Sequence, residues 1–473
     1  MIIYLQYICC QCSKKGFQVL GLIILSTVLH YYYLVEFHSE LMNTGRMLPL
    51  YNIAANLVDD NGFFISYDFV REASRFVYEK GENLDYFMLE EIIDVSNRYS
   101  KPRIVGGFGY SYLLYLFWIH TPVKTYIYIQ IFQVVVDILI VLLIYRIGET
   151  INSCSGFIAG LLYLTSYPVL FFSVLPNKEF FTIWITIIAC YLFIRFLSTE
   201  ENKYLLIISL LLSCGLFIRM SFFMVVAGFI LFLFLYRGFG SAVRGVFFLL
   251  IPFVVLFVIP AAIIHYEYMG SYNFMAIASA WNLWAGLGEY PNEYGFVCSD
   301  TLMFEHLAEI GIKPEPSIAM ARALREEAMS VIIRNPMFYI YTVLRRCFDI
   351  FFYQRSIYPF SLQGLYRVHE CRLREILESR ACSRLDILLV KIFIVVYGKL
   401  LNVIFIIGIA YNYIYAKNQY IFLLFFIWAS KILPHILTHI EARYVAEIIW
   451  PQFLVTAWII SRVIFRDNIV ATG

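Results

Sequence analysis

The feature that most constrains this chain is a run of apolar residues that recurs at close to the length needed to cross a bilayer. A transmembrane helix takes about 20 predominantly apolar residues. The runs that reach or approach this length cover residues 17–36, 125–146, 153–174, 180–198, 204–218, 220–236, 245–267, 386–412, 418–435 and 446–465. Because helices satisfy their backbone hydrogen bonds internally, the sequence predicts an all-α integral membrane protein with about ten transmembrane helices.

The composition agrees with lipid as the solvent. Of the 473 residues, 61% are hydrophobic and only 15% are charged. Soluble domains are about half apolar and about a quarter charged, and a single soluble core stops growing near about 250–300 residues. A soluble enzyme and a disordered chain are therefore both disfavoured. The formal net charge of +2 offers no electrostatic footprint for DNA or RNA, so we expect no nucleic-acid partner.

Lysine and arginine in the short loops indicate how the helices are oriented. Cytoplasmic loops carry an excess of these residues. One side of the predicted bundle collects Lys14, Lys15, Arg146, Arg195, Lys203, Arg237, Arg244, Lys417, Arg462 and Arg466. Assigning that side to the cytoplasm leaves residues 37–106 and 268–385 outside. Parity then makes residues 107–119 a re-entrant or interfacial segment, with an eleventh span as the alternative.

This topology divides the chain into parts. These are an N-terminal transmembrane module (1–267) that contains the first outer loop (37–106), a large extracytoplasmic loop (268–385) and the C-terminal transmembrane helices (386–473). Apolar positions from Leu50 to Val58 have helical spacing, which is typical of an amphipathic helix on a membrane surface. Residues 338–352 are apolar but contain Arg345 and Arg346, so they are also expected at the interface.

Aromatic and polar residues gather in one outer segment, residues 281–295. Trp281 and Trp284 offer ring faces that stack on sugars, and Glu289 and Asn292 can hydrogen-bond to hydroxyls. We therefore predict that these four residues line a sugar or acceptor site. The alternative is an aromatic belt at the membrane interface with glycine turns.

Two arginines at outer helix ends are candidates to bind a lipid-linked phosphate. Arg219 lies between two apolar runs, where a lone charge is costly unless it is paired or faces a polar cavity. Glu179 as a structural partner and a substrate phosphate are the alternatives. Arg443 lies in an outer turn, where it can bind phosphate or simply snorkel to the interface. The predicted phosphate ligands are Arg219 and Arg443, then Lys178 and His439, with Tyr444 assigned to the sugar or acceptor.

One carboxylate lies inside a predicted span. Asp137 follows Gln133 by one helical turn and is distant from the outer face. An intramembrane carboxylate is a functional-site hypothesis by default, but a proton-coupled transporter would need several such groups. We therefore favour a hydrogen-bonded structural role for Asp137.

Short patterns of residues follow one another in a definite order. They are the amphipathic stretch Tyr51–Phe63, GxGYxxLL at Gly107–Leu114, YPxLxxxxxxxxE at Tyr167–Glu179, GLxxR ending at Arg219, WxGLGExPNxYG at Trp284–Gly295 and HxExRY at His439–Tyr444. In their order and their shared placement on one membrane face, they resemble the polytopic GT-C glycosyltransferases. The resemblance is to the bacterial branch related to protein O-mannosyltransferases, and it covers most of the chain.

The resemblance implies an enzyme of a bacterial cytoplasmic (inner) membrane with its active site on the extracytoplasmic face. Such an enzyme passes a sugar, with inversion, from a polyprenyl-phosphate donor to a glycan, lipid or protein acceptor. An acidic residue at the start of the first outer loop acts as general base, and basic residues stabilise the leaving phosphate. The candidate bases are Glu40, Asp59 and Asp60, because Arg46 and Met47 stand where the family usually has its aspartate. No cofactor and no metal site is predicted.

Two other functions remain open at this point. A transporter or flippase for a lipid-linked saccharide would have pseudo-symmetric halves and helices broken at the midplane. An O-antigen-type polymerase would also combine about ten spans with one large outer loop, but it would transfer whole oligosaccharides from a diphosphate lipid.

Overall fold

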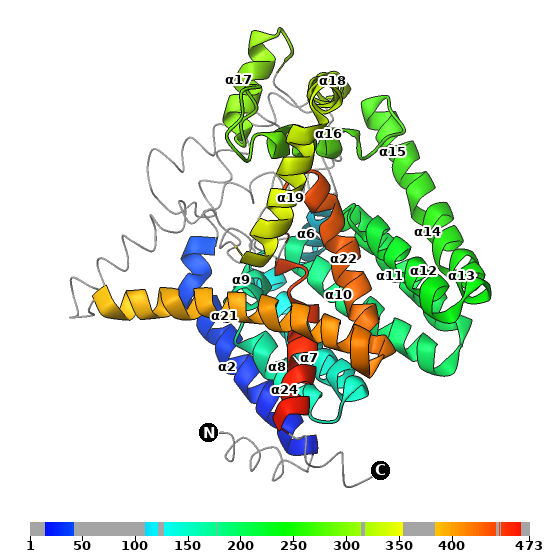
Figure 1. Cartoon of the computed structure of the whole chain (residues 1–473), viewed down its shortest axis with the longest axis vertical. Helices are drawn as coiled ribbons and strands as arrows, with labels where there is room; N and C mark the ends of the chain where they lie inside the picture. The colour runs from blue at the N-terminus through cyan, green and yellow to red at the C-terminus, as the bar shows by residue number, and fades with distance from the viewer. Residues whose placement is uncertain are drawn as a thin grey trace.

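The computed structural model describes residues 15–41, 109–121, 127–176, 178–313, 317–352, 384–440, 444 and 446–464. Every regular element in these ranges is a helix (Figure 1). The helices are α2 (Lys15–Leu41), α6 (Gly109–Ile119), α7 (Ile127–Ile151), α8 (Ser155–Leu164), α9 (Tyr167–Val174), α10 (Lys178–Thr199), α11 (Asn202–Ile218), α12 (Phe222–Arg237), α13 (Phe239–Gly245), η1 (Val246–Leu250), α14 (Ile251–Phe253), η2 (Val254–Val258), α15 (Ile259–Met269), α16 (Ala276–Leu287), α17 (Asp300–Glu309), α18 (Ile318–Arg334), α19 (Pro336–Phe352), α21 (Arg384–Tyr411), η4 (Asn412–Ala416), α22 (Gln419–Leu437) and α24 (Trp450–Ile464).

Five stretches of the described chain are long and apolar enough to cross a membrane. They are Ile127–Ile151, Lys178–Thr199, Phe239–Glu267, Tyr397–Ala416 and Gln419–Leu437. Ser155–Leu164, Asn202–Ile218 and Phe222–Arg237 are apolar but shorter. The prediction of an all-α integral membrane protein is confirmed, whereas the number of about ten spans stays a prediction.

Two predicted segments prove shorter than a span. The run 153–174 is two helices, α8 and α9, which separate at Thr165 and Ser166. Pro168 has no backbone N–H to donate to the preceding turn, so it fits the first turn of α9 but not the middle of one long helix. The segment 107–119 contains α6, whose 11 residues measure about 16 Å, less than the about 30 Å hydrocarbon core.

The apolar stretch Phe239–Glu267 contains two short π-helical segments, η1 and η2, each followed by a proline-containing helix start. Pro252 and Pro260 lack the N–H that would close a regular α-turn, which favours the wider π-turn before them. Of the apolar 18-residue window in this stretch, only 11% is buried. It therefore lies at the edge of the bundle, along the right-hand side of Figure 1.

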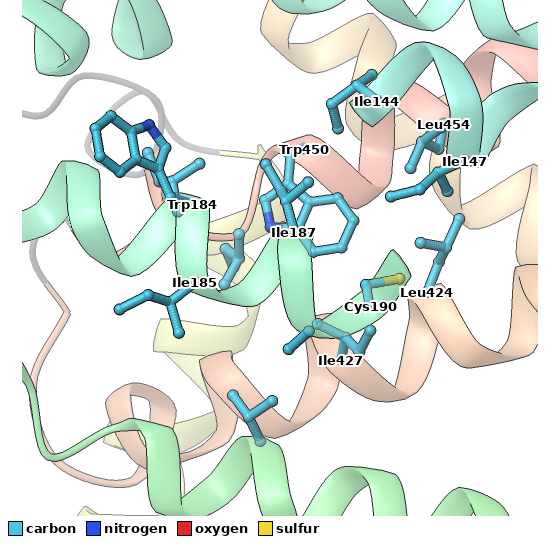
Figure 2. Close-up of a cluster of buried hydrophobic side chains, with 14 of the residues drawn as sticks. Ile144, Ile147, Trp184, Ile185, Ile187, Cys190, Leu424, Ile427, Trp450 and Leu454 are labelled. Carbon is cyan, nitrogen blue, oxygen red and sulfur yellow. The ribbon is translucent and has the colours of Figure 1, made fainter. Parts of the chain in front are cut away.

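The buried side chains form two separate hydrophobic cores. The larger core unites the long helices; in Figure 2, Trp184, Ile187 and Cys190 of α10 lie among Leu424 and Ile427 of α22 and Trp450 and Leu454 of α24. The smaller core is built by α16, α17 and α18, which lie together at the top of Figure 1. We call residues 276–334 the cap. Helix α19 runs from the cap to the bundle, where it contacts α21 and α22.

The hairpin of α10 and α11 has charged residues at both ends. Glu179 and Arg219 lie at one end, because α10 begins and α11 ends there. At the opposite end, Glu200 is 3.9 Å from both Arg237 and Arg244. Arg237 and Arg244, two of the basic residues expected in the cytoplasm, thus lie at the end away from Arg219. Their side of the membrane, and the division of the chain at residues 267 and 385, stay predictions.

Candidate functional site

Four charged side chains meet inside the bundle. Glu179 comes from the first turn of α10, Arg219 from the turn between α11 and α12, Lys431 from α22, and Glu447 from the turn before α24. The arginine side chain is 10% exposed, and the other three are 1% exposed or less. Buried charges are tolerated in apolar surroundings only when they are paired. We call these four residues the Arg219 cluster.

Local backbone geometry places Arg219. Helix α11 ends at this residue, which has extended backbone angles and donates its N–H to the Gly215 carbonyl at 2.7 Å. Gly215 is needed because a Cβ there would lie 2.8 Å from the ring of Phe222. Helix α12 can therefore begin three residues later and pack closely against α11. The arginine is left in the tight turn between them.

Glu447 is the centre of the cluster. It forms an ion pair with Arg219, whose Nη1 is also 3.3 Å from Glu179 Oε1. The other oxygen of Glu447 lies 3.0 Å from Lys431 Nζ, and that amine donates to Ser221 Oγ at 2.9 Å. With all four groups ionised, two positive and two negative charges balance. This balance lowers the free-energy cost of burying the cluster in the apolar bundle.

Aromatic rings cover the cationic groups. The Arg219 guanidinium lies 4.6 Å from the centre of the Tyr444 ring, and Lys431 Nζ lies 4.9 Å from the centre of the Phe222 ring. Tyr444 in turn stacks on His435, with ring centres 4.0 Å apart. Such cation–π contacts orient a charged group without neutralising it. The arrangement can therefore present a guanidinium to an anion.

A second charged group joins the cap, α19 and the end of α22. The Glu289 carboxylate accepts from Arg346 Nε at 2.6 Å and from the Ile440 N–H at 2.7 Å, and its Oε1 is 2.5 Å from His439 Nδ1. Its side chain is 9% exposed. Burial by itself would raise the pKa of Glu289, but the hydrogen bond with His439 and the charge of Arg346 outweigh it and hold the pKa below the ordinary value. Glu289 is therefore a stable anion.

The remaining predicted sugar ligands lie in the cap. Trp284 is buried and donates Nε1 to Glu327 at 3.0 Å, and Trp281 meets Phe304 edge to face at 5.1 Å between ring centres. The Asn292 side chain is used by its own loop, donating to the Tyr290 and Phe296 carbonyls at 3.0 Å. A sugar contact for these residues stays a prediction.

The structure brings some of the predicted residues together and leaves others apart. Arg219 lies against Tyr444, His439 lies against Glu289, and the rings of His439 and Tyr444 meet edge to face at 6.4 Å between centres. Lys178 is the first residue of α10, next to Glu179. The backbone of Glu40 lies in the last turn of α2. Asp59, Asp60 and Arg443 lie outside the described residues.

Glu447, Lys431 and Arg346 are members of these two groups that sequence reasoning did not assign to a site. Lys431 and Glu447 each interrupt an apolar run, and the rule that intramembrane charges mark functional sites would have selected both. Arg346 stood out as costly at a bilayer centre. Its partner Glu289 lies 57 residues away, a separation that no local pattern indicates.

Asp137 has the hydrogen-bonded environment expected of it. It is buried, accepts from the Tyr163 hydroxyl at 2.6 Å and lies 2.7 Å from His30 Nε2. Gln133, one turn earlier, donates to the Leu175 carbonyl at 2.9 Å. This face of α7 therefore joins α2 and α8, and it also holds the chain just after α9.

In comparison with known proteins, one part of the chain matches a family model. Residues 111–265 match the family model described as dolichyl-phosphate-mannose-protein mannosyltransferase. The resemblance to membrane glycosyltransferases is thereby confirmed over a segment that contains Lys178, Glu179 and Arg219. No curated protein matches the chain.

Among solved structures, the chain is similar to the archaeal oligosaccharyltransferase AglB from Archaeoglobus fulgidus, in complex with an inhibitory peptide and a dolichol-phosphate. The identity is 14% and the TM-score is 0.44. The match covers 97% of this chain and 52% of that chain. This chain therefore spans about half the length of that protein.

Proposed function

We propose that the chain is a membrane glycosyltransferase that moves a sugar from a polyprenyl-phosphate donor to an acceptor on the extracytoplasmic face. The observation that carries this proposal is the Arg219 cluster, in which two buried cations share one carboxylate. The glycosyltransferase family match, residues 111–265, includes Arg219 and Glu179. The envelope of a bacterium is the setting that we infer for the reaction.

Arg219 is the proposed ligand of the donor phosphate. A guanidinium has five N–H donors in a planar fork that fits phosphate oxygens. Glu179 and Glu447 both contact the same nitrogen, Nη1. A phosphate can therefore bind through other N–H groups while the two carboxylates keep the arginine in place. Lys431, held by Glu447, adds positive charge behind it. Arg443, Lys178 and His439 stay proposed as further phosphate ligands.

The proposed reaction is an inverting displacement at the anomeric carbon. The acceptor hydroxyl oxygen bonds to that carbon as the bond to the phosphate oxygen breaks, and polyprenyl phosphate leaves with the bonding electrons. A carboxylate, Glu40, Asp59 or Asp60, takes the hydroxyl proton. The cationic groups stabilise the negative charge that grows on the leaving phosphate. Trp281, Trp284, Glu289, Asn292 and Tyr444 are the predicted residues on the sugar or acceptor side.

Transfer from labelled donors tests the proposal. The purified protein in lipid nanodiscs is given radiolabelled polyprenyl-phosphate monosaccharides, and both transferred sugar and released polyprenyl phosphate are measured. We expect Arg219→Ala to lower the rate by about 100-fold or more. Arg195→Ala is the matched control, because Arg195 is exposed near the opposite end of the same hairpin. It should keep the wild-type rate.

Three outcomes separate the alternatives. Full activity in both Arg219→Ala and Arg443→Ala contradicts the phosphate assignment. Transfer only from diphosphate-linked oligosaccharides identifies a polymerase. Movement of the lipid-linked sugar across the bilayer without any transfer identifies a transporter.

A further inference from the structure

We propose that Glu289 is a positioning residue, which fixes the segment after α22 and thereby places Tyr444 and Glu447 against Arg219. The proposal rests on the proposed function, because it gives Glu289 an effect on the phosphate site. It differs from the direct sugar contact that the sequence predicts for this residue.

Protein donors surround the Glu289 carboxylate. One oxygen accepts from the Arg346 guanidinium, and the other faces His439 Nδ1 and the Ile440 N–H. The two residues held by Oε1 are consecutive and come directly after the turn that ends α22. A carboxylate bonded to a backbone N–H and to the adjacent side chain fixes both the position and the orientation of that piece of chain.

Arg346 connects the Glu289 carboxylate to the ends of two helices. Its Nη1 donates to the Ile436 carbonyl at 3.0 Å and its Nη2 to the Gly286 carbonyl at 2.5 Å. These carbonyls lie in the last turns of α22 and α16, where the helical hydrogen bonding ends and a positive charge is favoured. Tyr339, two turns before Arg346 on the same face of α19, donates to the Leu437 carbonyl at 2.7 Å. Helix α19 therefore holds the end of α22 by two side chains.

The glycines around Glu289 allow the cap to come this close. A Cβ at Gly286 would lie 1.6 Å from the Thr438 carbonyl oxygen and 2.7 Å from Arg346 Nη2. A Cβ at Gly288 would lie 2.4 Å from the backbone of Val297. The first glycine is thus required by contact between the cap and the turn after α22, and the second by the fold of the cap loop itself. Together they present Glu289 to residues 439 and 440.

His439, which Glu289 holds, is connected to the Arg219 cluster through Tyr444. The His439 ring contacts the Tyr444 ring, and Tyr444 lies over the Arg219 guanidinium while stacking on His435. Three residues further on, Glu447 pairs with Arg219. Glu289 therefore holds His439 and Ile440, and Arg219 contacts Tyr444 and Glu447 further along the chain. Loss of the bonds to Glu289 should weaken the contacts with Arg219.

Hydrogen–deuterium exchange in nanodiscs tests the anchoring without any ligand. We compare wild type with Glu289→Gln, which keeps the shape of the side chain but replaces one acceptor oxygen by a donor NH₂ that faces the donors around it. Amides of residues 438–440, 444 and 446–449 should exchange about tenfold faster in the variant, because local opening governs their protection. The control is Glu293→Gln, an exposed carboxylate in the same loop. Unchanged exchange of these amides in Glu289→Gln overturns the proposal.

Binding of farnesyl phosphate, a short polyprenyl phosphate, tests the effect on the site. We expect Glu289→Gln to raise the Kd about tenfold, with little further loss when it is combined with Arg219→Ala. In the transfer assay the variant should raise KM for the donor without changing the preference among donor sugars. A changed sugar preference with unchanged farnesyl phosphate binding shows direct sugar contact and contradicts positioning.

A milder variant covers the case in which Glu289→Gln does not fold. His439→Asn leaves the Ile440 and Arg346 bonds to Glu289 in place, and should speed the same amide exchange to a smaller extent. Failure of wild type to bind farnesyl phosphate contradicts the proposed function. The exchange experiment still decides, by itself, whether Glu289 holds His439 and Ile440 in place.

Discussion

Glu447 and Glu289 are both buried carboxylates in contact with an arginine, but their other partners are of different kinds. Glu447 lies between two charged side chains, Arg219 and Lys431. Glu289 binds a backbone N–H, the His439 ring and an arginine whose remaining N–H groups bind carbonyls. Side chains can rotate towards a new anion, whereas backbone groups at helix ends cannot. We therefore expect the cations around Glu447 to be able to bind an added anion, and the partners of Glu289 to keep their positions.

The largest effect should come from removing charge at Glu447. Glu447→Gln leaves Lys431 without its carboxylate partner and Arg219 with Glu179 alone, and breaking a buried ion pair costs about 3–5 kcal/mol. We expect a large fall in the thermal unfolding temperature in detergent. Adding Lys431→Met should recover most of that stability but not the transfer activity. A single variant as stable as wild type would show that the two cations do not need Glu447.

Glu289 should give a smaller, pH-dependent loss. The change to Gln removes a charge-assisted hydrogen bond worth about 1.5–3 kcal/mol. Because the pKa of Glu289 is lowered from 4.5 in the folded protein, the unfolded chain binds more protons in acid. The stabilisation is therefore complete above pH 4.5 and is lost as the pH falls through the folded pKa.

Unfolding temperatures measured at pH 7 and at pH 4 check this sign. The difference between wild type and Glu289→Gln should shrink towards acid pH. Glu293→Gln should match wild type at both values. A difference that grows as the pH falls would contradict the lowered pKa.

Asp137 is a reference carboxylate that contacts no arginine or lysine among the described residues. Asp137→Asn keeps an acceptor for the Tyr163 hydroxyl but weakens the bond to His30. The expected cost is about 0.5–1.5 kcal/mol, with unchanged binding of farnesyl phosphate. Thermal unfolding and the binding assay measure the two quantities. A loss of binding here would mean that the sites are coupled through α7.

Tyr444 should show the smallest change in stability. Tyr444→Leu removes the ring that lies over Arg219, and such a contact is worth about 0.5–1 kcal/mol. Tyr444→Phe keeps the ring and serves as the control. Weaker farnesyl phosphate binding in the Leu variant alone would show that the ring orients the guanidinium. Equal losses in both variants would instead point to the hydroxyl group.

Local patterns predicted the elements of the fold better than the contacts among them. The apolar runs located the long helices, because a run of about 20 apolar residues is a local property of the chain. The break between α8 and α9 depends on Pro168, and Pro168 is also visible in the sequence. The sequence indicates Glu179 as one of two alternatives for the partner of Arg219, the other being a substrate phosphate. It does not indicate Glu447, because Glu447 reaches Arg219 only through the packing of α24 against α22 and of α22 against α12.

For the candidate site too, local patterns indicated single residues but not their contacts with distant parts of the chain. For the motif around Glu289, the sequence predicts that the carboxylate lines a sugar or acceptor site, and its glycines enter only as turns in the alternative of an aromatic belt. Their contacts with Thr438, His439 and Ile440 depend on a chain turn about 150 residues away. Sequence spacing within the motif carries no information about that turn. The candidate bases Asp59 and Asp60 lie outside the described residues and stay predictions.

The edge stretch Phe239–Glu267 connects the bundle to the cap. Its length determines how it fits bilayers of different thickness. Its 29 residues measure about 43 Å at the rise of an α-helix, against a hydrocarbon core of about 30 Å. It must therefore tilt or extend into the headgroups. The cap begins nine residues after its end, so we expect bilayer thickness to set how far the cap stands from the lipid surface. Activity measured in short-chain and long-chain phosphatidylcholine should differ for this reason alone.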